Sequence, residues 1–429
     1  MTPRDHDASR DSRPPVRSGP QPKIIRGRPG YRSFSLAALQ ERVEAQLEEE
    51  LAGRSDILLD ALDETARREL VREAGEYVLA VEAVSLGAAE KAGLFDAVYR
   101  RLFTFGPLDA LLTDDLITDL TIDGYERVYL RRRYGKPEAV RSPFEDAYSY
   151  ARVLDRMLTG AGAQLVDAEP FIEVGLTLLG RPARLTLVAP PLSPVLHVDL
   201  RLHPARPATL ENLMAEKAVT QTDADMLRAL GRSPYGILIV GEAAAGKTTL
   251  LESLLPYVAD RSSCWLVERA REVRAPLEMH SLAAIPARQD HPGVEFAAQI
   301  EAALAESPGT LILDELRGDE AGPFWKALSG QDAPRCLGVF RSSPNPERLH
   351  SAFGILIRKG QAAVDQALID RALLDRMPFV IAVQGGAAGL HVKAISEWTE
   401  GEDGRLALLP LVQDGQATGH RSGREPVFP

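Results

Sequence analysis

One stretch near the middle of the chain constrains its fold more than any other. Residues 236–251 read GILIVGEAAAGKTTLL. The aliphatic residues 237–240 predict a short buried strand, and residues 241–248 fit the phosphate-loop spacing G-x-x-x-x-G-K-[ST] without a mismatch. In such a loop, backbone N–H groups converge on a phosphate chain, and a glycine at each end lets the backbone approach closely. A chance match is the alternative, but the apolar strand before the loop and the leucine-rich helix after it argue against chance.

The side chains of this loop have separate expected roles. Lys247 should reach the β and γ phosphates, Thr248 should hold Mg²⁺ through its hydroxyl, and Thr249 should cover the α phosphate. The expected ligands are therefore ATP and Mg²⁺. The residues expected to contact the nucleotide are Gly241, Glu242, Ala243, Ala244, Ala245, Gly246, Lys247, Thr248 and Thr249.

Length and composition limit the remaining possibilities. A chain of 429 residues predicts two or three domains, because single cores seldom grow beyond about 250 to 300 residues. No apolar run approaches the roughly 18 residues that span a bilayer, and the polar start lacks the core of a signal peptide, so we expect a cytoplasmic protein without a membrane span. The net charge of −11 disfavours a nucleic-acid partner. The two cysteines predict neither a disulfide framework nor a metal cluster.

Changes in composition and periodicity divide the chain into six segments. Residues 1–34 are rich in Pro, Arg, Ser and Gly and predict a disordered tail, whose basic character leaves contact with acidic lipid or a partner as an alternative. Apolar residues then recur at three- and four-residue steps, and a hairpin signal follows at Asp123-Gly124. The expected order is a helical region at 35–105, an α+β N-terminal domain at 106–203, a linker at 204–222, a parallel α/β domain at 223–414 and a C-terminal tail at 415–429.

Two adjacent acids end a second apolar strand of the α/β domain. The run 310–315 reads TLILDE, and ligands bind at the carboxyl ends of the strands in open parallel sheets. Beside a phosphate loop, one acid orients Mg²⁺ through water and the other accepts a proton from the attacking water. A solvated strand end is the alternative. We therefore expect Thr248, Asp314 and Glu315 to form the metal site.

The combination of these motifs resembles one family. The phosphate loop at 241–249, the strand end Trp265–Glu268 and the run Asp314–Gly318 are similar to motifs of the CpaF/TadA-type ATPases of the type II/IV secretion superfamily, the motors of Flp/Tad pilus assembly. The upstream runs FGPLDALL, DLTIDGYERVYL, RPARLTLVAPPL and VDLRLH follow the order of that family's N-terminal domain. The resemblance covers residues 36–412 and implies a RecA-like motor domain behind the α+β domain.

The resemblance also implies roles for particular residues. Glu315 matches the acid that activates water, and Glu268 and Glu272 match the acids of the family's aspartate-rich box. Arg184 and Arg201 match arginines that reach towards the nucleotide phosphates from the N-terminal domain, whereas without the resemblance they are surface or sheet-edge charges. The expected catalytic set is Glu315, Glu268, Arg184, Arg201 and Gln331.

The sequence departs from the family pattern at several positions. The T-G-H segment appears as Ser329-Gly330-Gln331 and the H-A-N-S-P segment as residues 340–344, so Gln331 and Phe340 stand where the family has histidines. We expect both to lie near the γ-phosphate, beside Arg341, whose charge either compensates or belongs to an exposed strand end. Residues 243–245 are alanines in place of Gly, Ser or Thr, and Arg269 replaces a frequent acid.

The resemblance implies a homo-hexameric, cytoplasmic ATPase that powers pilus assembly or protein secretion through an inner-membrane platform protein. The missing histidines and the alanine-filled loop favour an alternative, which is a weakly hydrolysing or inactive nucleotide-binding subunit beside an active paralogue. A nucleic-acid translocase built on the same core is a third hypothesis. The acidic charge balance and the secretion-type N-terminal domain disfavour it.

Overall fold

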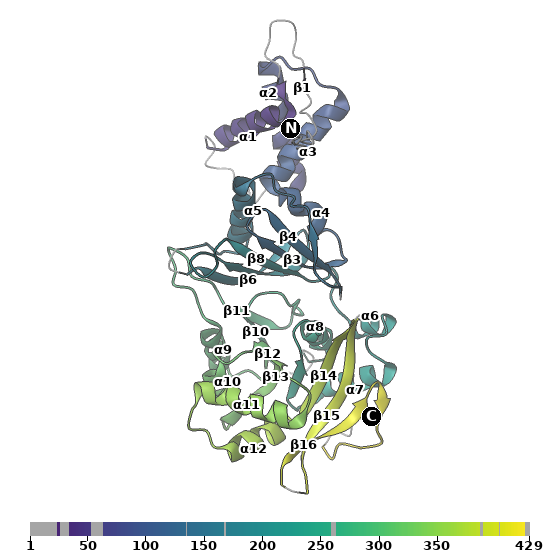
Figure 1. Cartoon of the computed structure of the whole chain (residues 1–429). Coiled ribbons are helices and arrows are strands. Elements are labelled where there is room, and N and C mark those ends of the chain that lie inside the picture. Colours follow the sequence, from purple (N-terminus) through teal and green to yellow (C-terminus); the bar gives the residue numbers. More distant parts are fainter. Residues whose placement is uncertain are drawn as a thin grey trace, which may run out of the picture. The chain divides into compact units, whose positions relative to one another are not determined.

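The computed structural model describes residues 24–25, 34–52, 63–133, 135–166, 169–258, 263–386, 389–402 and 404–424. The chain forms two compact units, residues 1–106 and residues 107–429, which are described separately below (Figure 1). Most of the expected N-terminal tail lies outside the described residues. Within it, Ile24–Ile25 (β1) pairs in antiparallel fashion with Phe34–Ser35 (β2).

The described residues of the first unit form three helices. They are α1 (Leu36–Ala52), α2 (Glu64–Val81) and α3 (Ala88–Phe103). The apolar residues spaced three and four apart, such as Leu39, Val43 and Leu47, are fully buried in one cluster that also contains Leu94. Asp63 caps α2 by accepting a hydrogen bond from the backbone N–H of Ala66 at 2.8 Å. The predicted helical region is therefore confirmed.

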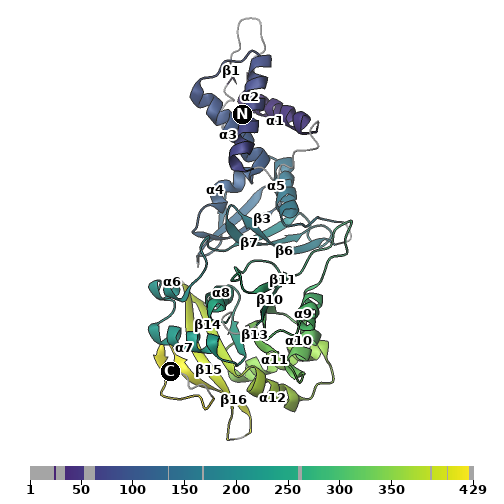
Figure 2. The ribbon, with the colours of Figure 1, turned by 180° about the vertical axis from the view of Figure 1, so that it is seen from behind.

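The second unit begins with an antiparallel six-stranded sheet in the order β5-β4-β3-β8-β7-β6. Along β7, Leu185 and Leu187 are buried on one face, and Arg184 points to the other because side chains alternate in a strand. Helix α5 covers the face of the sheet that lies away from the parallel strands (Figures 1 and 2). The elements are η2 (Gly106–Leu108), α4 (Asp109–Leu112), β3 (Ile117–Asp123), β4 (Arg127–Arg132), β5 (Glu138–Val140), α5 (Ala147–Gly160), β6 (Phe171–Leu178), β7 (Arg181–Val188) and β8 (His197–Leu202).

A nine-stranded sheet follows, in the order β11-β10-β12-β13-β9-β14-β15-β16-β17. Strands β11 to β14 of this order run parallel, and β15 to β17 add an antiparallel extension. The strands are β9 (Ile237–Gly241), β10 (Cys264–Glu268), β11 (His280–Ala283), β12 (Thr310–Leu316), β13 (Arg335–Arg341), β14 (Phe379–Gly386), β15 (Gly389–Glu400), β16 (Leu406–Gln413) and β17 (Gln416–Ala417). The predicted α/β class, with a RecA-like motor domain behind an α+β domain, is confirmed by this arrangement.

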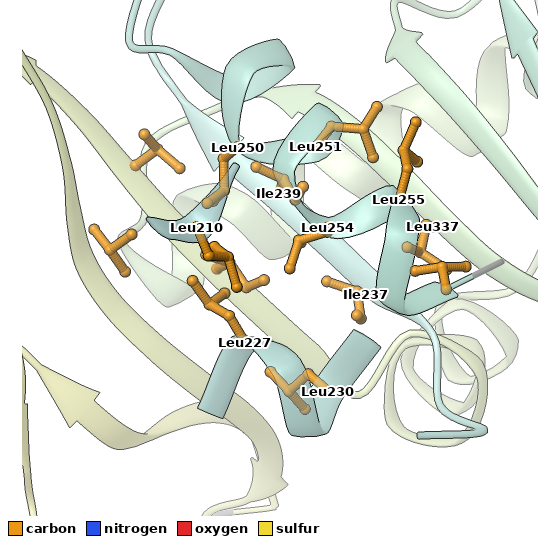
Figure 3. Packing of buried hydrophobic residues seen from close by; sticks show 14 of the residues in the cluster. Leu210, Leu227, Leu230, Ile237, Ile239, Leu250, Leu251, Leu254, Leu255 and Leu337 are labelled. Atoms are coloured by element: carbon orange, nitrogen blue, oxygen red, sulfur yellow. The ribbon is translucent and has the colours of Figure 1, made fainter. Parts of the chain in front are cut away.

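Helices cover both faces of the parallel strands. They are α6 (Leu210–Ala215), α7 (Gln221–Arg232), α8 (Lys247–Val258), α9 (Phe296–Ala305), α10 (Ala321–Ser329), α11 (Pro346–Gly360) and α12 (Gln366–Arg376). Ile237 and Ile239 of β9 pack with leucines of α7 and α8 (Figure 3), whereas Leu238 and Val240 belong to the cluster on the opposite face. Strand β9 is fully buried on both sides, as its continuous apolar run predicts.

The structure adds order at three places that the sequence pattern did not indicate. Helix α6 lies inside the expected linker. Near the end of that linker, Thr220 caps the N-terminus of α7. Strand β7 begins at Arg181, whose buried guanidinium donates to the backbone carbonyls of Leu112, Asp114, Ile117 and His203. In the expected C-terminal tail, β17 pairs with β16 and Arg424 donates to Glu397. Residues 425–429 of that tail lie outside the described residues.

The described helices also bear on the expected absence of a membrane span. None of them is both long and apolar enough to cross a bilayer.

Candidate functional site

Residues 241–246 form the loop between β9 and α8. A Cβ atom on Gly241 would stand 2.3 Å from the carbonyl oxygen of Val383, so no larger residue fits there. Gly246 has φ +91° and packs against Leu390, where a Cβ would approach a side-chain carbon to 2.4 Å. Ala244 also adopts a left-handed conformation, with φ +58°. The two motif glycines are thus required by β14 and β15, and one alanine holds a conformation that favours glycine.

Lys247 is the first residue of α8. Its Nζ donates a hydrogen bond to the carbonyl oxygen of Glu242, at 2.7 Å, and so closes the loop on itself. The pKa of Lys247 is lowered to about 8, mainly by burial; Glu315 opposes this effect, and Arg201 and Arg341 add to it. An anion bound here would raise this pKa again, because opposite charges nearby favour ionisation.

Two adjoining cavities open at the loop. The smaller, of about 80 Å³, is lined by Arg184, Arg201, Ala243, Ala244, Ala245, Gly246, Lys247, Thr248, Asp314, Glu315, Val339 and Arg341. The larger, of about 1230 Å³, shares Arg201 and most of the loop with the smaller one. It extends to residues 202–206, to the β14–β15 hairpin and to Asp119 and Arg131 of the N-terminal sheet. A volume of this size accommodates a nucleotide.

Asp314 is a buried acid with one unsatisfied oxygen. Its Oδ2 accepts a hydrogen bond from the backbone N–H of Arg269 at 3.1 Å, and its Oδ1 has no hydrogen-bond partner in the described part of the chain. Burial, followed by the nearby charge of Glu268, raises the pKa of Asp314 well above its usual value. A proton or a cation is needed to satisfy this oxygen.

Mg²⁺ fits this set of residues. Thr248 and Asp314 line the same small cavity, and hydroxyl and carboxylate oxygens are the ligands that Mg²⁺ takes together with water and phosphate. Among the described residues no cluster of three His, Cys, Asp or Glu side chains suits a metal ion by itself. The ion would therefore arrive with phosphates and keep part of its water shell.

Glu315 is held by two arginines. Its Oε2 accepts hydrogen bonds from Nη2 of Arg317 at 2.6 Å and from Nη1 of Arg184 at 3.3 Å. Burial raises the pKa of Glu315, but Arg317 and Arg184 more than offset this effect, so the pKa lies below its usual value. Glu315 is thus ionised at neutral pH, and its basicity is weakened while both pairs persist.

Glu268 and Glu272 differ in protonation although both are buried. Oε1 of Glu268 accepts the backbone N–H groups of Glu272 and Val273 at 3.0 and 2.8 Å, and burial raises the pKa of Glu268 to about 7. Burial also disfavours the charge on Glu272, but Arg184 and His203 more than offset it and lower the pKa to about 2. His203 Nε2 lies 2.8 Å from Glu272.

The two arginines carried over from the resemblance have different surroundings. The guanidinium of Arg184 contacts the carboxylates of Glu272, Glu173 and Glu315, and its side chain is 11% exposed. Arg201 lines both cavities and has no ion-pair partner within the described residues. The structure thus brings Arg184, Arg201, Asp314 and Glu315 to the phosphate loop, and it leaves Arg201 available to an anion.

Gln331 does not lie where the resemblance placed it. It is exposed in the turn before β13, and Arg335 at the start of that strand pairs with Thr310 at the start of β12. The phosphate loop lies at the opposite end, where Arg341 pairs with Gly241. A seven-residue strand, about 20 Å long, separates the two ends. The expectation that Gln331 contacts the γ-phosphate within the same chain is therefore wrong.

Phe340 lies at the correct end of β13 but faces away from the cavity. Its side chain is buried, and its ring packs at 86° against Phe353 with centroids 6.4 Å apart. Because side chains alternate along a strand, the next residue, Arg341, points to the other side and lines the small cavity. The expectation that the Phe340 side chain lies near the γ-phosphate is thus wrong. The side chain of Arg341 lines the cavity instead.

Three further residues of the site were not singled out from the sequence. Glu173 and Arg317 form an ion pair at 2.8 Å beside Arg184 and Glu315, and His203 contacts Glu272. A hairpin at Leu179-Gly180, which joins two predicted strands, is the signal that puts Glu173 on the face of Arg184. His203 ends the run VDLRLH that carries part of the resemblance, but the pattern gave this histidine no role.

Arg269 has a structural role instead of the acidic one that is frequent at its position. Its guanidinium contacts Asp319 and Glu320, and it lies 4.4 Å from the ring centroid of Phe296. It thus anchors the loop that follows β12.

Comparison with known proteins finds a family model that matches part of the chain. Residues 173–329 match the model of the family described as "Type II/IV secretion system protein". The putative conjugal transfer protein Rv3659c of Mycobacterium tuberculosis is 29% identical over 253 residues, 57% of this chain and 71% of that protein. Type IV secretion system protein PtlH of Bordetella pertussis is 33% identical over 108 residues, 24% of this chain and 32% of that protein.

Solved structures show looser likenesses. The pilus retraction motor PilT with bound ADP has a TM-score of 0.45 and 16% identity, and covers 71% of this chain and 81% of its own. The VirB11 ATPase of the Brucella suis type IV secretion system has a TM-score of 0.34 and 19% identity, and covers 69% of this chain and 97% of its own.

Proposed function

We propose that this chain is an ATP-hydrolysing motor of the secretion type. One observation carries the proposal, which is that Lys247 and Thr248 of the phosphate loop, the acids of β12 and Arg201 line a single small cavity. That cavity adjoins a groove large enough for the rest of a nucleotide. The match of residues 173–329 to a secretion-system family supports the same conclusion independently.

The residues of the site suit phosphoryl transfer to water. The loop N–H groups and Lys247 are placed to bind the phosphate chain, and Thr248 and Asp314 would hold Mg²⁺, which would supply positive charge to neutralise the phosphates. Glu315 accepts the proton of the attacking water. Because Arg184 and Arg317 occupy its Oε2, Glu315 must exchange at least one of these partners to become an effective base.

The finer identity rests on the sequence resemblance. Motifs from residue 36 to residue 412 favour the CpaF/TadA type, and with it a cytoplasmic homo-hexamer that drives Flp-type pilus assembly or protein secretion through an inner-membrane platform protein. Nucleic acid is not among the proposed partners, because the chain carries a net charge of −11.

A specific observation favours the second candidate, a slowly hydrolysing assembly subunit. Neither Gln331 nor the ring of Phe340 reaches the phosphate cavity, and the proposed base is clamped by two arginines. The turnover of the assembled ring, measured with and without the platform protein, separates the two candidates. A turnover well above background favours the motor, and a turnover near background favours the assembly subunit.

The test of nucleotide use compares two lysine variants of the full chain. Lys247→Ala should lose most ATP affinity or turnover, because it removes a phosphate donor at the start of α8, and its effect on melting temperature should be limited to the loss of one hydrogen bond to Glu242. The matched control is Lys326→Ala, which removes an exposed charge on α10 and should behave as wild type. Unchanged ATP binding and turnover in Lys247→Ala contradict the proposal.

A further inference from the structure

Arg341 occupies a distinctive place in the parallel sheet. It ends β13, the strand between β9, which leads into the phosphate loop, and β12, which carries the two acids. The strand register sets Arg341 beside Gly241, and Phe340 lies beside both Val240 of β9 and Leu316 of β12. Arg341 therefore lies between the start of the phosphate loop and the acids that would hold Mg²⁺ and water.

The two cavities distinguish Arg341 from Arg201. Arg201 lines both of them, whereas Arg341 lines only the small cavity, together with Lys247, Asp314 and Glu315. The large groove, which has room for a base and a sugar, does not include Arg341. A nucleotide that lies along both cavities would thus present its terminal phosphate to Arg341, because Lys247 and the acids mark that end of the site.

The charge of Arg341 is not satisfied by the protein. Within the described residues its guanidinium has no ion-pair or hydrogen-bond partner, in contrast to Arg184, which contacts three carboxylates. Lys247 and Arg201 line the same cavity, and within the described part of the chain Lys247 donates only to a backbone carbonyl.

We infer that Arg341 binds the terminal phosphate of a nucleoside triphosphate and lets the site distinguish a triphosphate from a diphosphate, an inference that rests on the proposed function. The guanidinium donates a planar fork of N–H groups that matches two phosphate oxygens, which an ammonium group does not. A diphosphate would end at Lys247 and leave Arg341 without a partner. Arg341 thus binds the terminal phosphate, which only a triphosphate places beside it.

The experiment measures binding of two nucleotides to the full chain in the presence of Mg²⁺. The probes are ADP and a non-hydrolysable ATP analogue, and the proteins are wild type, Arg341→Ala, Arg341→Lys and the control Arg371→Ala. Arg371 lies on α12 with an 81% exposed side chain, so its loss removes the same charge far from the loop. Melting temperatures show that each variant is folded.

The expected result is a selective loss. Arg341→Ala should weaken binding of the triphosphate analogue by a factor on the order of ten, as the loss of a charged hydrogen bond does, and change ADP binding by less than about threefold. Arg341→Lys should lie between wild type and Arg341→Ala, and Arg371→Ala should match wild type.

Two results overturn the inference alone. One is equal weakening of both nucleotides in Arg341→Ala, which indicates a general electrostatic effect, and the other is unchanged binding of both. A wild-type chain that binds neither nucleotide overturns the proposed function and this inference with it. If wild type binds both nucleotides and Arg341→Ala binds them equally well, the inference fails but the proposed function stands.

Discussion

Arg184 of β7 donates from Nε to Oε2 of Glu272, in the loop after β10, at 3.1 Å. Its Nη1 also contacts Glu173 of its own sheet and Glu315 of β12. Gly175 of β6, which pairs with Arg184, lies so close to the loop after β10 that a Cβ atom on it would stand 2.2 Å from the carbonyl oxygen of Arg271. An arginine that the resemblance assigned to phosphate thus joins the N-terminal sheet to the acids of the motor domain.

This arrangement sharpens the division of roles between the two acids of β12. We expect Glu315→Gln to keep binding of Mg²⁺ and ATP and to lower the turnover number by a factor on the order of a hundred, as loss of a positioned base does. Asp314→Asn should instead weaken the dependence of binding on Mg²⁺, because Oδ1 of Asp314 is the unsatisfied oxygen at the cavity.

Steady-state turnover and Mg²⁺-dependent ATP binding are the two measurements. Glu347→Gln, an exposed residue of α11, is the matched control and should leave both unchanged. If Asp314→Asn abolishes turnover at unchanged Mg²⁺ dependence while Glu315→Gln remains active, the roles of the two acids are reversed.

The phosphate loop yields a prediction about stability. Ala244 has a left-handed φ of +58°, whereas its neighbour Ala243 does not lie in the left-handed region. Ala244→Gly relieves a strain of about 1 to 2 kcal/mol and costs about 0.4 to 1 kcal/mol in unfolded-chain entropy, so it should be neutral or stabilising by up to about 1.6 kcal/mol. Ala243→Gly relieves no such strain and has only the entropy cost, so it should destabilise the protein by about 0.4 to 1 kcal/mol.

Denaturant unfolding without nucleotide compares the two glycine variants with wild type. The test is whether the unfolding free energy falls in Ala243→Gly but not in Ala244→Gly, since both variants remove one methyl group from the same loop. Equal destabilisation by the two substitutions shows that Ala244 is not held in the left-handed conformation.

The sequence predicts the fold well where a pattern has one physical meaning. The continuous apolar run 237–240 requires a strand buried on both faces, and the motif glycines require close backbone approach, as contacts with Val383 and Leu390 show. The start of α6 inside the expected linker was not predictable in the same way. This helix has only six residues, and burial of Leu210 and Leu213 against the motor core stabilises it.

The site is predicted less completely because its contacts join distant segments. Pairing of Arg184 with Glu272 spans 88 residues of sequence and depends on how the N-terminal sheet packs on the loop after β10. Gln331 was misplaced because the family motif gives a position in the sequence, whereas β13 runs the length of the sheet between that position and the loop. Strand alternation at Phe340 and Arg341 decides which of the two faces the cavity.

The last prediction concerns pH and the buried acid Glu268. Its side chain is inaccessible to solvent, and burial raises its pKa from an ordinary value of 4.5 to about 7. Because the folded state binds this proton more tightly than the unfolded state, the stabilisation is fully present below pH 4.5 and is lost as the pH rises through 7. The difference corresponds to on the order of 3 kcal/mol. Glu272, whose pKa is lowered to about 2, acts in the opposite direction, but its contribution is lost only as the pH falls below about 4.5.

Glu268→Gln removes this titration and keeps an oxygen that accepts the backbone N–H groups of Glu272 and Val273. We expect the variant to match wild type at pH 5 and to be more stable at pH 8, by up to on the order of 3 kcal/mol. Melting temperatures of both proteins at the two pH values test this, with Glu278→Gln, an exposed residue, as the control that should show no pH-dependent difference. A variant less stable than wild type at pH 8 means that Glu268 is ionised in the folded protein, held by those two N–H groups against the cost of burial.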